Sequence, residues 1–179
     1  MKSSRARGLV LGSAILAILI STGAIVHALP LDFNTTASEP IGLYRLVGPR
    51  TMYQPGSFVE VCLPATVLRT TIELGIRLQR GRCPGGVVPL IKRVAAGPEQ
   101  RVCVSELGVL VDGHSLPNSR PQPKTTAGKP LHADLGCHVV PAAEVWVASS
   151  NPRGYDSRYF GPVRPLTAAV PVLTYTTQE

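Results

Sequence analysis

Ser38 and Lys92 are the residues of this sequence whose types and surroundings are best suited to chemistry. Ser38 lies in the segment NTTASEPIGLY at 34–44, and Lys92 lies in the segment PLIKRV at 89–94. A serine hydroxyl is a poor nucleophile until a neighbouring base removes its proton. A lysine amine can be that base only in its neutral form, which burial favours. Together the two side chains could attack a carbonyl group without a histidine.

Each residue also fits a simpler interpretation. A serine before Glu-Pro commonly begins or caps a turn. Lys92 could be a surface lysine, because it neighbours Arg93 in an apolar strand and adjacent side chains point to opposite faces. At an unperturbed pKa near 10.4, only about one lysine in 2,500 is neutral at pH 7, so a catalytic Lys92 must be buried. No triad context surrounds the histidines, which are His27, His114, His132 and His138.

The chain begins with a basic cluster and a long apolar segment. Lys2, Arg5 and Arg7 precede residues 8–31, which carry no charged side chain. An apolar helix of about 20 residues crosses a hydrocarbon layer of about 30 Å. We therefore predict a cytoplasmic segment at 1–7, a single transmembrane anchor at 8–29 and a periplasmic domain at 30–179, placed at the inner membrane. The alternative is a removed signal peptide, with Val26-His27-Ala28 as an imperfect cleavage site.

The charge pattern leaves two interpretations open. The net charge is +7, and four arginines fall between Arg69 and Arg82, opposed only by Glu73. They could contact an anionic partner or form the solvated face of a helix. Aromatic side chains are not interleaved with them, as they are in grooves that bind single-stranded nucleic acid. We therefore expect no nucleic-acid partner, and nothing in the sequence suggests a metal or another cofactor.

The cysteines form an even set, Cys62, Cys83, Cys103 and Cys137. An oxidising compartment would pair them, and their spacings match no zinc signature. Four cysteines allow three connectivities. We favour Cys62–Cys83 and Cys103–Cys137, because each disulfide then closes one separate loop of the chain. Free buried thiols are the alternative.

Composition predicts a mainly β domain with one inserted helix. Glycine and proline number 17 each and aromatic residues make up 5%, which favours short strands and turns. The helix is expected at 66–79 with Thr66 as its N-cap, a hairpin turn at Asp112-Gly113 and an exposed loop at 117–130. The expected strands are 41–46, 57–63, 87–95, 101–104, 109–111, 144–149 and 168–175.

Four short motifs, in their order along the chain, resemble the signal peptidase I family and most closely its TraF branch. The first is Ser-x-Pro-x-Gly-x-Tyr at 38–44. A Pro-Gly turn and strand follow at 55–64, then Ile-Lys-Arg-Val at 91–94 and Tyr-Asp-Ser-Arg-Tyr-Phe-Gly-Pro at 155–162. With the apolar segment they cover residues 8–162. The resemblance implies a signal-peptidase-like β domain behind a membrane anchor.

The resemblance also implies roles for individual residues. Ser38 would be the nucleophile and Lys92 the general base. The Thr36 hydroxyl and the Ser38 backbone N–H would form the oxyanion hole, where donors must face the developing negative charge. Asp156 and Arg158 would support the site, and Pro40 and Tyr44 would bind the substrate.

The implied function is that of a membrane-anchored serine endopeptidase. Members of the TraF branch process an exported pilin precursor for the conjugative transfer machinery, and the product can be cyclised. Gly154 replaces a serine that orients the lysine in the leader-cleaving branch, Glu39 replaces a methionine, and Pro98-Glu99-Gln100 replaces a Pro-Gly-Asp turn. The first two departures favour a dedicated processing enzyme. The alternatives are a general leader peptidase and a non-enzymatic assembly factor of a secretion channel.

Overall fold

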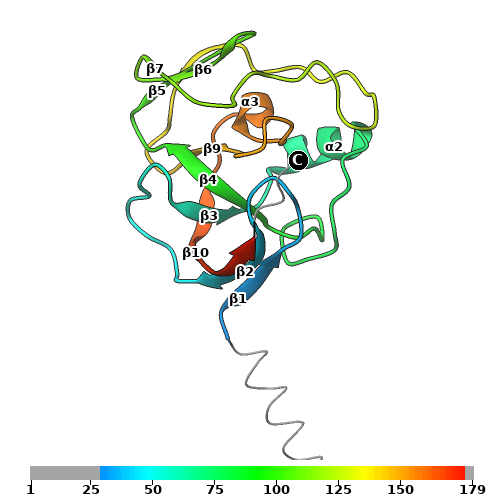
Figure 1. Cartoon of the computed structure of the whole chain (residues 1–179), viewed down its shortest axis with the longest axis vertical. Coiled ribbons are helices and arrows are strands. Elements are labelled where there is room, and N and C mark those ends of the chain that lie inside the picture. The colour runs from blue at the N-terminus through cyan, green and yellow to red at the C-terminus, as the bar shows by residue number, and fades with distance from the viewer. Residues whose placement is uncertain (1–28, 176–179) are drawn as a thin grey trace, which may run out of the picture. The chain divides into compact units, whose positions relative to one another are not determined.

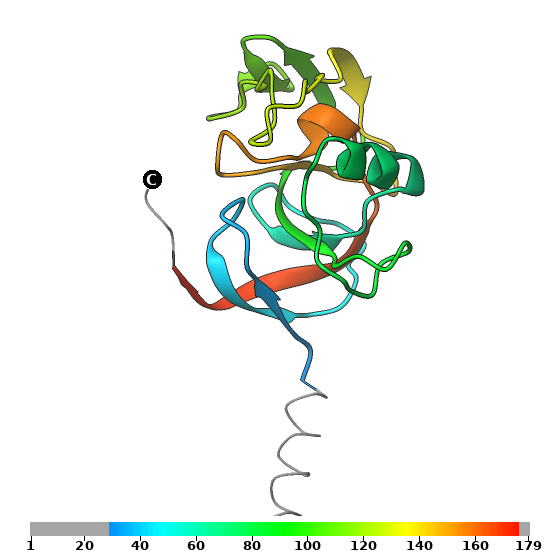
Figure 2. The same ribbon diagram turned by 90° about the vertical axis from the view of Figure 1, so that its right-hand side faces the viewer.

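The computed structural model describes residues 29–175 and shows a domain in which strands dominate (Figure 1, Figure 2). Among these residues, no helix has the length and apolar character needed to cross a membrane. The predicted anchor at 8–29 lies, apart from Leu29, outside the described residues.

The larger of two sheets has six strands in the order β1-β2-β10-β3-β4-β9. Neighbouring strands from β2 to β9 pair antiparallel, and the C-terminal strand β10 lies between β2 and β3. A strand near the start of the domain, β2, therefore pairs with the last strand, β10, inside the sheet. Its strands are β1 Leu31–Asn34, β2 Ile41–Leu46, β3 Phe58–Val61, β4 Leu90–Ala96, β9 Trp146–Ala148 and β10 Pro165–Tyr175.

The smaller sheet has the order β7-β6-β5-β8 and lies at the top of Figure 1. Asp112 and Gly113 connect β6 to β7 with positive φ angles of 48° and 83°, as a type I′ hairpin turn requires. The sheet packs valines from β5 and β6 around the buried Trp146 of β9. Its strands are β5 Arg101–Ser105, β6 Gly108–Val111, β7 His114–Ser115 and β8 Gly136–Val139.

The described residues contain two helices, α2 at Ala65–Glu73 and α3 at Ser157–Phe160, where we predicted one. The predicted helix at 66–79 is thus too long, because Gly75 takes a left-handed φ of 74° and closes the helix. Pro64, not Thr66, occupies the N-cap position, without a side-chain cap. The second helix was missed because a single turn is too short for any apolar period to emerge.

Each predicted strand has a counterpart among the described residues, with bounds that differ by up to three residues at either end. The strand expected at 87–95 begins at Leu90, because Pro89 has no N–H to donate to a ladder. The strand expected at 168–175 begins at Pro165. Three strands, β1, β7 and β8, were not predicted, since each has only two to four residues with little apolar alternation.

Two disulfides stabilise the domain, with the connectivity that we favoured. Cys62–Cys83 joins the end of β3 to the loop after α2, and Cys103–Cys137 joins the paired strands β5 and β8. The main core lies on one face of the larger sheet and includes Val59, Val94 and Val147. This face also carries Lys92, which lies opposite Val59.

Candidate active site

Lys92 points into the domain. It lies on β4 directly opposite Val59 of β3, and only 3% of its surface is exposed. Arg93 takes the other face of the strand and keeps 41% of its side chain exposed. The strand therefore buries the lysine and leaves the arginine at the surface, which the sequence could not decide.

Burial lowers the pKa of the Lys92 ammonium, because the charged form loses its hydration. The charges of Asp156 and Glu39 oppose this effect and raise the pKa, while the Arg158 charge lowers it further. The lowered pKa increases the fraction of neutral amine at a given pH. Lys92 thus has the property that a lysine base requires.

Asn34, the last residue of β1, shapes the loop that holds Ser38. Its buried side-chain nitrogen donates to the carbonyl oxygens of Thr36, Glu39 and Pro40 at 3.0, 3.0 and 3.1 Å. Its Oδ1 accepts the Thr36 backbone N–H at 3.1 Å. Three carbonyls on one side fix the orientation of the amide. We did not identify Asn34 from the sequence, although an asparagine at the start of a turn is a usable signal.

Ser38 is partly exposed and is hydrogen-bonded to Thr36, with 3.0 Å between their hydroxyl oxygens. The Thr36 hydroxyl donates its hydrogen to Asn34 Oδ1 at 2.9 Å, so Ser38 is the donor toward Thr36. For Thr36 to serve an oxyanion, its hydroxyl must rotate away from Asn34.

Tyr44 does not fit the substrate-binding role that we expected. It has no exposed surface, and its hydroxyl donates to the Pro40 carbonyl at 2.7 Å. Burial and the charge of Glu39 raise its pKa to about 12, so it stays protonated. Tyr44 therefore supports the Ser38 loop from inside the domain. Pro40 is partly exposed, so its substrate-binding role stays a prediction.

Asp156 and Arg158 form a buried ion pair whose charges both act on Lys92. Arg158 Nε donates to Oδ1 and Nη2 donates to Oδ2 of Asp156, both at 2.8 Å. The remaining guanidinium hydrogens reach the carbonyls of Arg120, Pro152 and Gly154 at 2.7–3.0 Å. Asp156 also accepts the Arg158 backbone N–H as the cap of α3. The pair holds together the turn that follows β9.

Ser149 and Ser150, just after β9, connect the separate motifs. The Ser149 hydroxyl donates to the Ser38 carbonyl, and its backbone N–H donates to Asp156 Oδ2 at 2.8 Å. The Ser150 N–H donates to Glu39 Oε1 at 3.2 Å, and its hydroxyl lies 3.3 Å from the Ser38 carbonyl. No local pattern marks either serine, because both contacts span more than 100 residues of sequence.

Glu39 joins the Ser38 loop to the lysine strand. Its carboxylate is fully buried and lies 3.6 Å from the guanidinium of Arg93, which stacks over Phe58 at 4.6 Å. Burial raises the pKa of Glu39, while the charges of Arg93 and Lys92 lower it. Ser38, Lys92 and Asp156 are thus brought together by contacts among their immediate neighbours.

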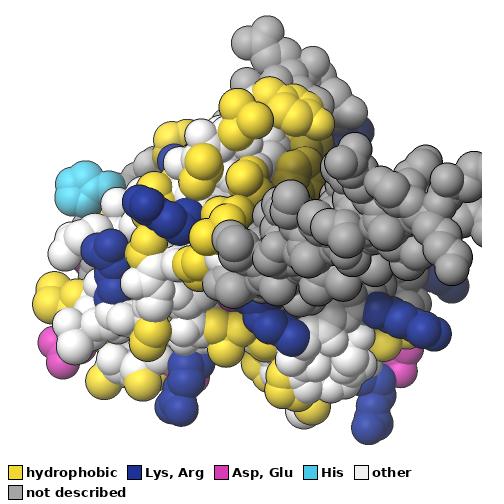
Figure 3. Space-filling view, turned by 90° about the horizontal axis from the view of Figure 1, so that it is seen from below, with side chains coloured by type: hydrophobic (Ala, Val, Ile, Leu, Met, Phe, Trp, Pro, Cys, Tyr) yellow, Lys and Arg dark blue, Asp and Glu magenta, His cyan; other side chains and the backbone are white. Residues whose placement is uncertain are grey.

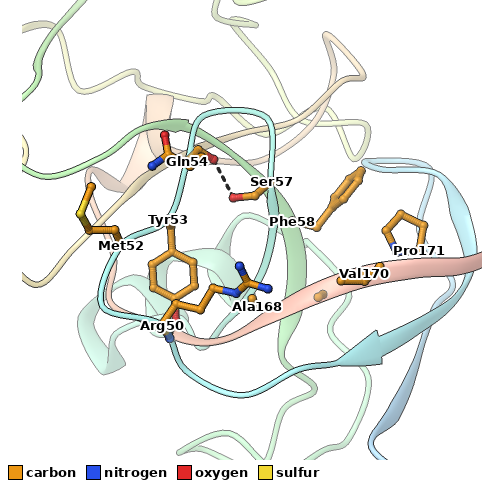
Figure 4. A pocket seen from close by; sticks show the side chains of 10 residues that line it. Arg50, Met52, Tyr53, Gln54, Ser57, Phe58, Ala168, Val170 and Pro171 are labelled. Carbon is orange, nitrogen blue, oxygen red and sulfur yellow. Dashed lines mark hydrogen bonds between the residues drawn. The ribbon is translucent and has the colours of Figure 1, made fainter.

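A shallow hollow of about 270 Å³ lies elsewhere, between the β2–β3 loop and β10. Figure 4 shows Tyr53, Phe58 and Val170 on its walls with Arg50 at its rim. None of the predicted site residues lines it. The candidate site is therefore the Ser38–Lys92 region and not this hollow.

The described residues thus form a mainly β domain with two sheets and two short helices, in which Lys92 is buried and the Ser38 loop is tied to the turn after β9. The model of the signal peptidase family, peptidase S26, matches residues 5–170, and the chain belongs to this family. It is 39% identical to a conjugal transfer protein TraF of Agrobacterium tumefaciens, over 98% of this chain and 99% of that protein. It is 32% identical to a plasmid transfer protein TraF of Escherichia coli, over 95% and 96% of the two chains. The chain is thus a TraF-type, signal-peptidase-like protein.

Proposed function

We propose that this chain is a serine endopeptidase in which Ser38 is the nucleophile and Lys92 is the general base. The buried position of Lys92 carries the proposal. A structural lysine on a half-buried strand would extend its ammonium to water, as Arg93 extends its guanidinium. A buried ammonium is costly even when the charges of Asp156 and Glu39 offset part of that cost, and a buried lysine with a lowered pKa is typical of functional sites.

The chemical steps follow from these two groups. The Ser38 Oγ attacks the carbonyl carbon of the scissile peptide while neutral Lys92 takes the hydroxyl proton. The Ser38 backbone N–H, with Thr36 after rotation of its hydroxyl, stabilises the oxyanion. Lys92 then passes its proton to the leaving amine as the C–N bond breaks. Water, activated in the same way, hydrolyses the resulting ester and releases Ser38.

The substrate class that we propose is an exported pilin precursor in conjugative transfer. The relatives bear the names of conjugal and plasmid transfer proteins, and the family is one of signal peptidases. The apolar segment at 8–29 would anchor the chain in the inner membrane with residues 30–179 in the periplasm. If the amino group of the precursor replaces water at the ester, the product is a cyclic peptide.

The test is a processing assay in cells that carry the pilin precursor of the same transfer system. We expect Ser38→Ala and Lys92→Ala each to reduce processing by at least about 10³-fold, because the two groups act as a unit. Mass spectrometry of the pilin measures cleavage, and a product one water lighter than the linear form shows cyclisation.

Ser105→Ala and Lys124→Ala serve as matched controls on exposed positions and should process the precursor normally. Persistent processing in either site variant would contradict the proposed dyad. Cleavage of many exported proteins with equal efficiency would instead identify a general leader peptidase.

A further inference from the structure

The turn after β9 allows a side chain at only one of two facing positions. The Gly154 N–H donates to the Asn151 carbonyl at 2.9 Å, which folds residues 149–154 back on themselves. A Cβ atom built on Gly154 would overlap the Cβ and Oγ of Ser149 and lie 3.0 Å from the Asn151 carbonyl. Ser149 therefore fills the space that a residue larger than glycine at 154 would need.

Ser149 uses this position to make three connections. Its hydroxyl donates to the Ser38 carbonyl and accepts the Asn151 N–H at 3.2 Å, and its own N–H donates to Asp156 at 2.8 Å. Only 6% of the residue is exposed. One buried side chain thus links the backbone of Ser38 to the turn, and its main chain is held by the carboxylate that faces Lys92.

We propose that Ser149 is the residue that positions the nucleophile of this enzyme, a role that rests on the proposed function of Ser38. The bond holds the carbonyl of Ser38 itself and so limits rotation of the peptide plane that follows the nucleophile. A hydroxyl directed at a substrate carbonyl loses much of its rate when it is misplaced by about 1 Å. The reaction therefore depends on this hydroxyl although it does not touch the substrate.

Ser150 provides a comparison within the same turn. Its hydroxyl also faces the Ser38 carbonyl, at 3.3 Å, but the residue is exposed and water can replace its bond. The buried Ser149 bond has no such replacement. Loss of the Ser149 hydroxyl should therefore have the larger effect.

The first experiment compares Ser149→Ala with Ser150→Ala in the full-length chain, with a peptide that carries the precursor cleavage site. We expect Ser149→Ala to lower kcat about 10- to 100-fold with little change in KM, and Ser150→Ala to lower it only slightly. The pH dependence should keep its acidic limb, because the groups that face Lys92 remain, namely Asp156, Glu39 and Arg158. An unchanged kcat, or a loss confined to KM, would overturn the proposal.

The second experiment moves the hydroxyl to the facing position. The single variant Gly154→Ser should melt well below the native chain, because its Cβ meets that of Ser149. Adding Ser149→Gly removes this overlap and should raise the melting temperature above that of Gly154→Ser, with the contact to the Asn151 carbonyl remaining. We expect Ser149→Gly/Gly154→Ser to recover part of the kcat that Ser149→Gly loses, and the control Ser149→Gly/Gly154→Ala not to recover it.

Equal kcat values in the two double variants would show that the hydroxyl is not the cause. A double variant that melts no higher than Gly154→Ser would contradict the exclusion between the two positions. Loss of processing in Ser38→Ala with full activity in Ser149→Ala would refute this inference alone. Activity in Ser38→Ala would refute the proposed function.

Discussion

Lys92 and Arg93 show how one strand assigns opposite roles to two adjacent cations. The lysine faces the core beside Val59 and the arginine stacks on Phe58 at the surface. Arginine retains its charge in almost any environment, whereas lysine can lose its proton when buried. The strand therefore buries the one cation that can become neutral.

We expect Lys92→Met to abolish processing and to raise the free energy of unfolding near neutral pH, because methionine removes a buried ammonium without leaving a cavity while Asp156 and Glu39 keep their arginine partners. The folded pKa of Lys92 lies below its unfolded value, so the native state binds fewer protons and the cost of Lys92 shrinks as the pH rises. The stability gain in Lys92→Met should therefore be largest below the folded pKa and fade toward about pH 10.4. Thermal melting measures it, with Lys124→Met as the exposed control.

Glu39 should contribute, after Asp156, to the pH range of the reaction. Its charge raises the pKa of Lys92, so Glu39→Gln should lower that pKa further and make the amine neutral at lower pH. The acidic limb of the kcat–pH profile then moves to lower pH. Glu106→Gln, on the exposed β5–β6 turn, should leave the profile in place. A shift to higher pH in Glu39→Gln would contradict this electrostatic relation.

At the scale of elements, β1 and β3 place two carboxylates, Asp32 and Glu60, beside Arg82, and the proposed chemistry uses neither. Glu60 of β3 is 1% exposed and forms an ion pair with Arg82, whose guanidinium also lies 3.9 Å from Asp32 of β1. Burial raises the pKa of Glu60 to about 7, a hydrogen bond with Asp32 adds to this rise, and Arg82 opposes it. The native state therefore holds a proton at Glu60 that the unfolded chain loses above its ordinary pKa.

This proton makes the fold less stable as the pH rises, because the native state binds more protons than the unfolded state. The loss develops from the ordinary glutamate value of 4.5 to the folded value of about 7. Glu60→Gln should remove it, so the melting temperature of the variant relative to the native chain should rise between about pH 5 and about pH 8. A constant difference across this range would contradict a raised pKa for Glu60.

For the whole molecule, the end formed by β1, β2 and β10 exposes apolar side chains. Phe33, Leu173 and Tyr175 are each more than half exposed, on strands that flank β2 in the sheet. Figure 3 shows hydrophobic side chains gathered on this side of the molecule with lysine and arginine side chains among them. Apolar surface with basic side chains among it suits an anionic bilayer surface.

We expect Phe33→Asp/Leu173→Asp to reduce cleavage of a precursor embedded in membranes and to leave cleavage of a soluble peptide unchanged. The aspartates would repel the bilayer surface, and the side chains that they replace are exposed. Leu107, which is even more exposed and lies on the β5–β6 turn, provides the control variant Leu107→Asp. Equal losses with both substrates would show that the face serves folding and not contact with the membrane.

The sequence alone predicted the mainly β class, the family and the segments that form the site. The class, the family and the site segments depend on local patterns, because the Ser38 and Lys92 motifs can each be recognised within a few residues. The predicted helix was too long and three short strands were missed, since their ends depend on turns and on neighbouring strands.

Only the tertiary structure decided which cation of β4 is buried, that Tyr44 is internal and that Ser149 holds Ser38. The Ser149–Ser38 contact joins residues 111 positions apart. The ion pair between Glu39 and Arg93 likewise joins two segments that are separate in the sequence. Neither partner carries a local signal for the other, because burial and hydrogen-bond geometry arise only when the strands pair. The sequence therefore determined which groups could react, and the packing of the sheet determined how they are held.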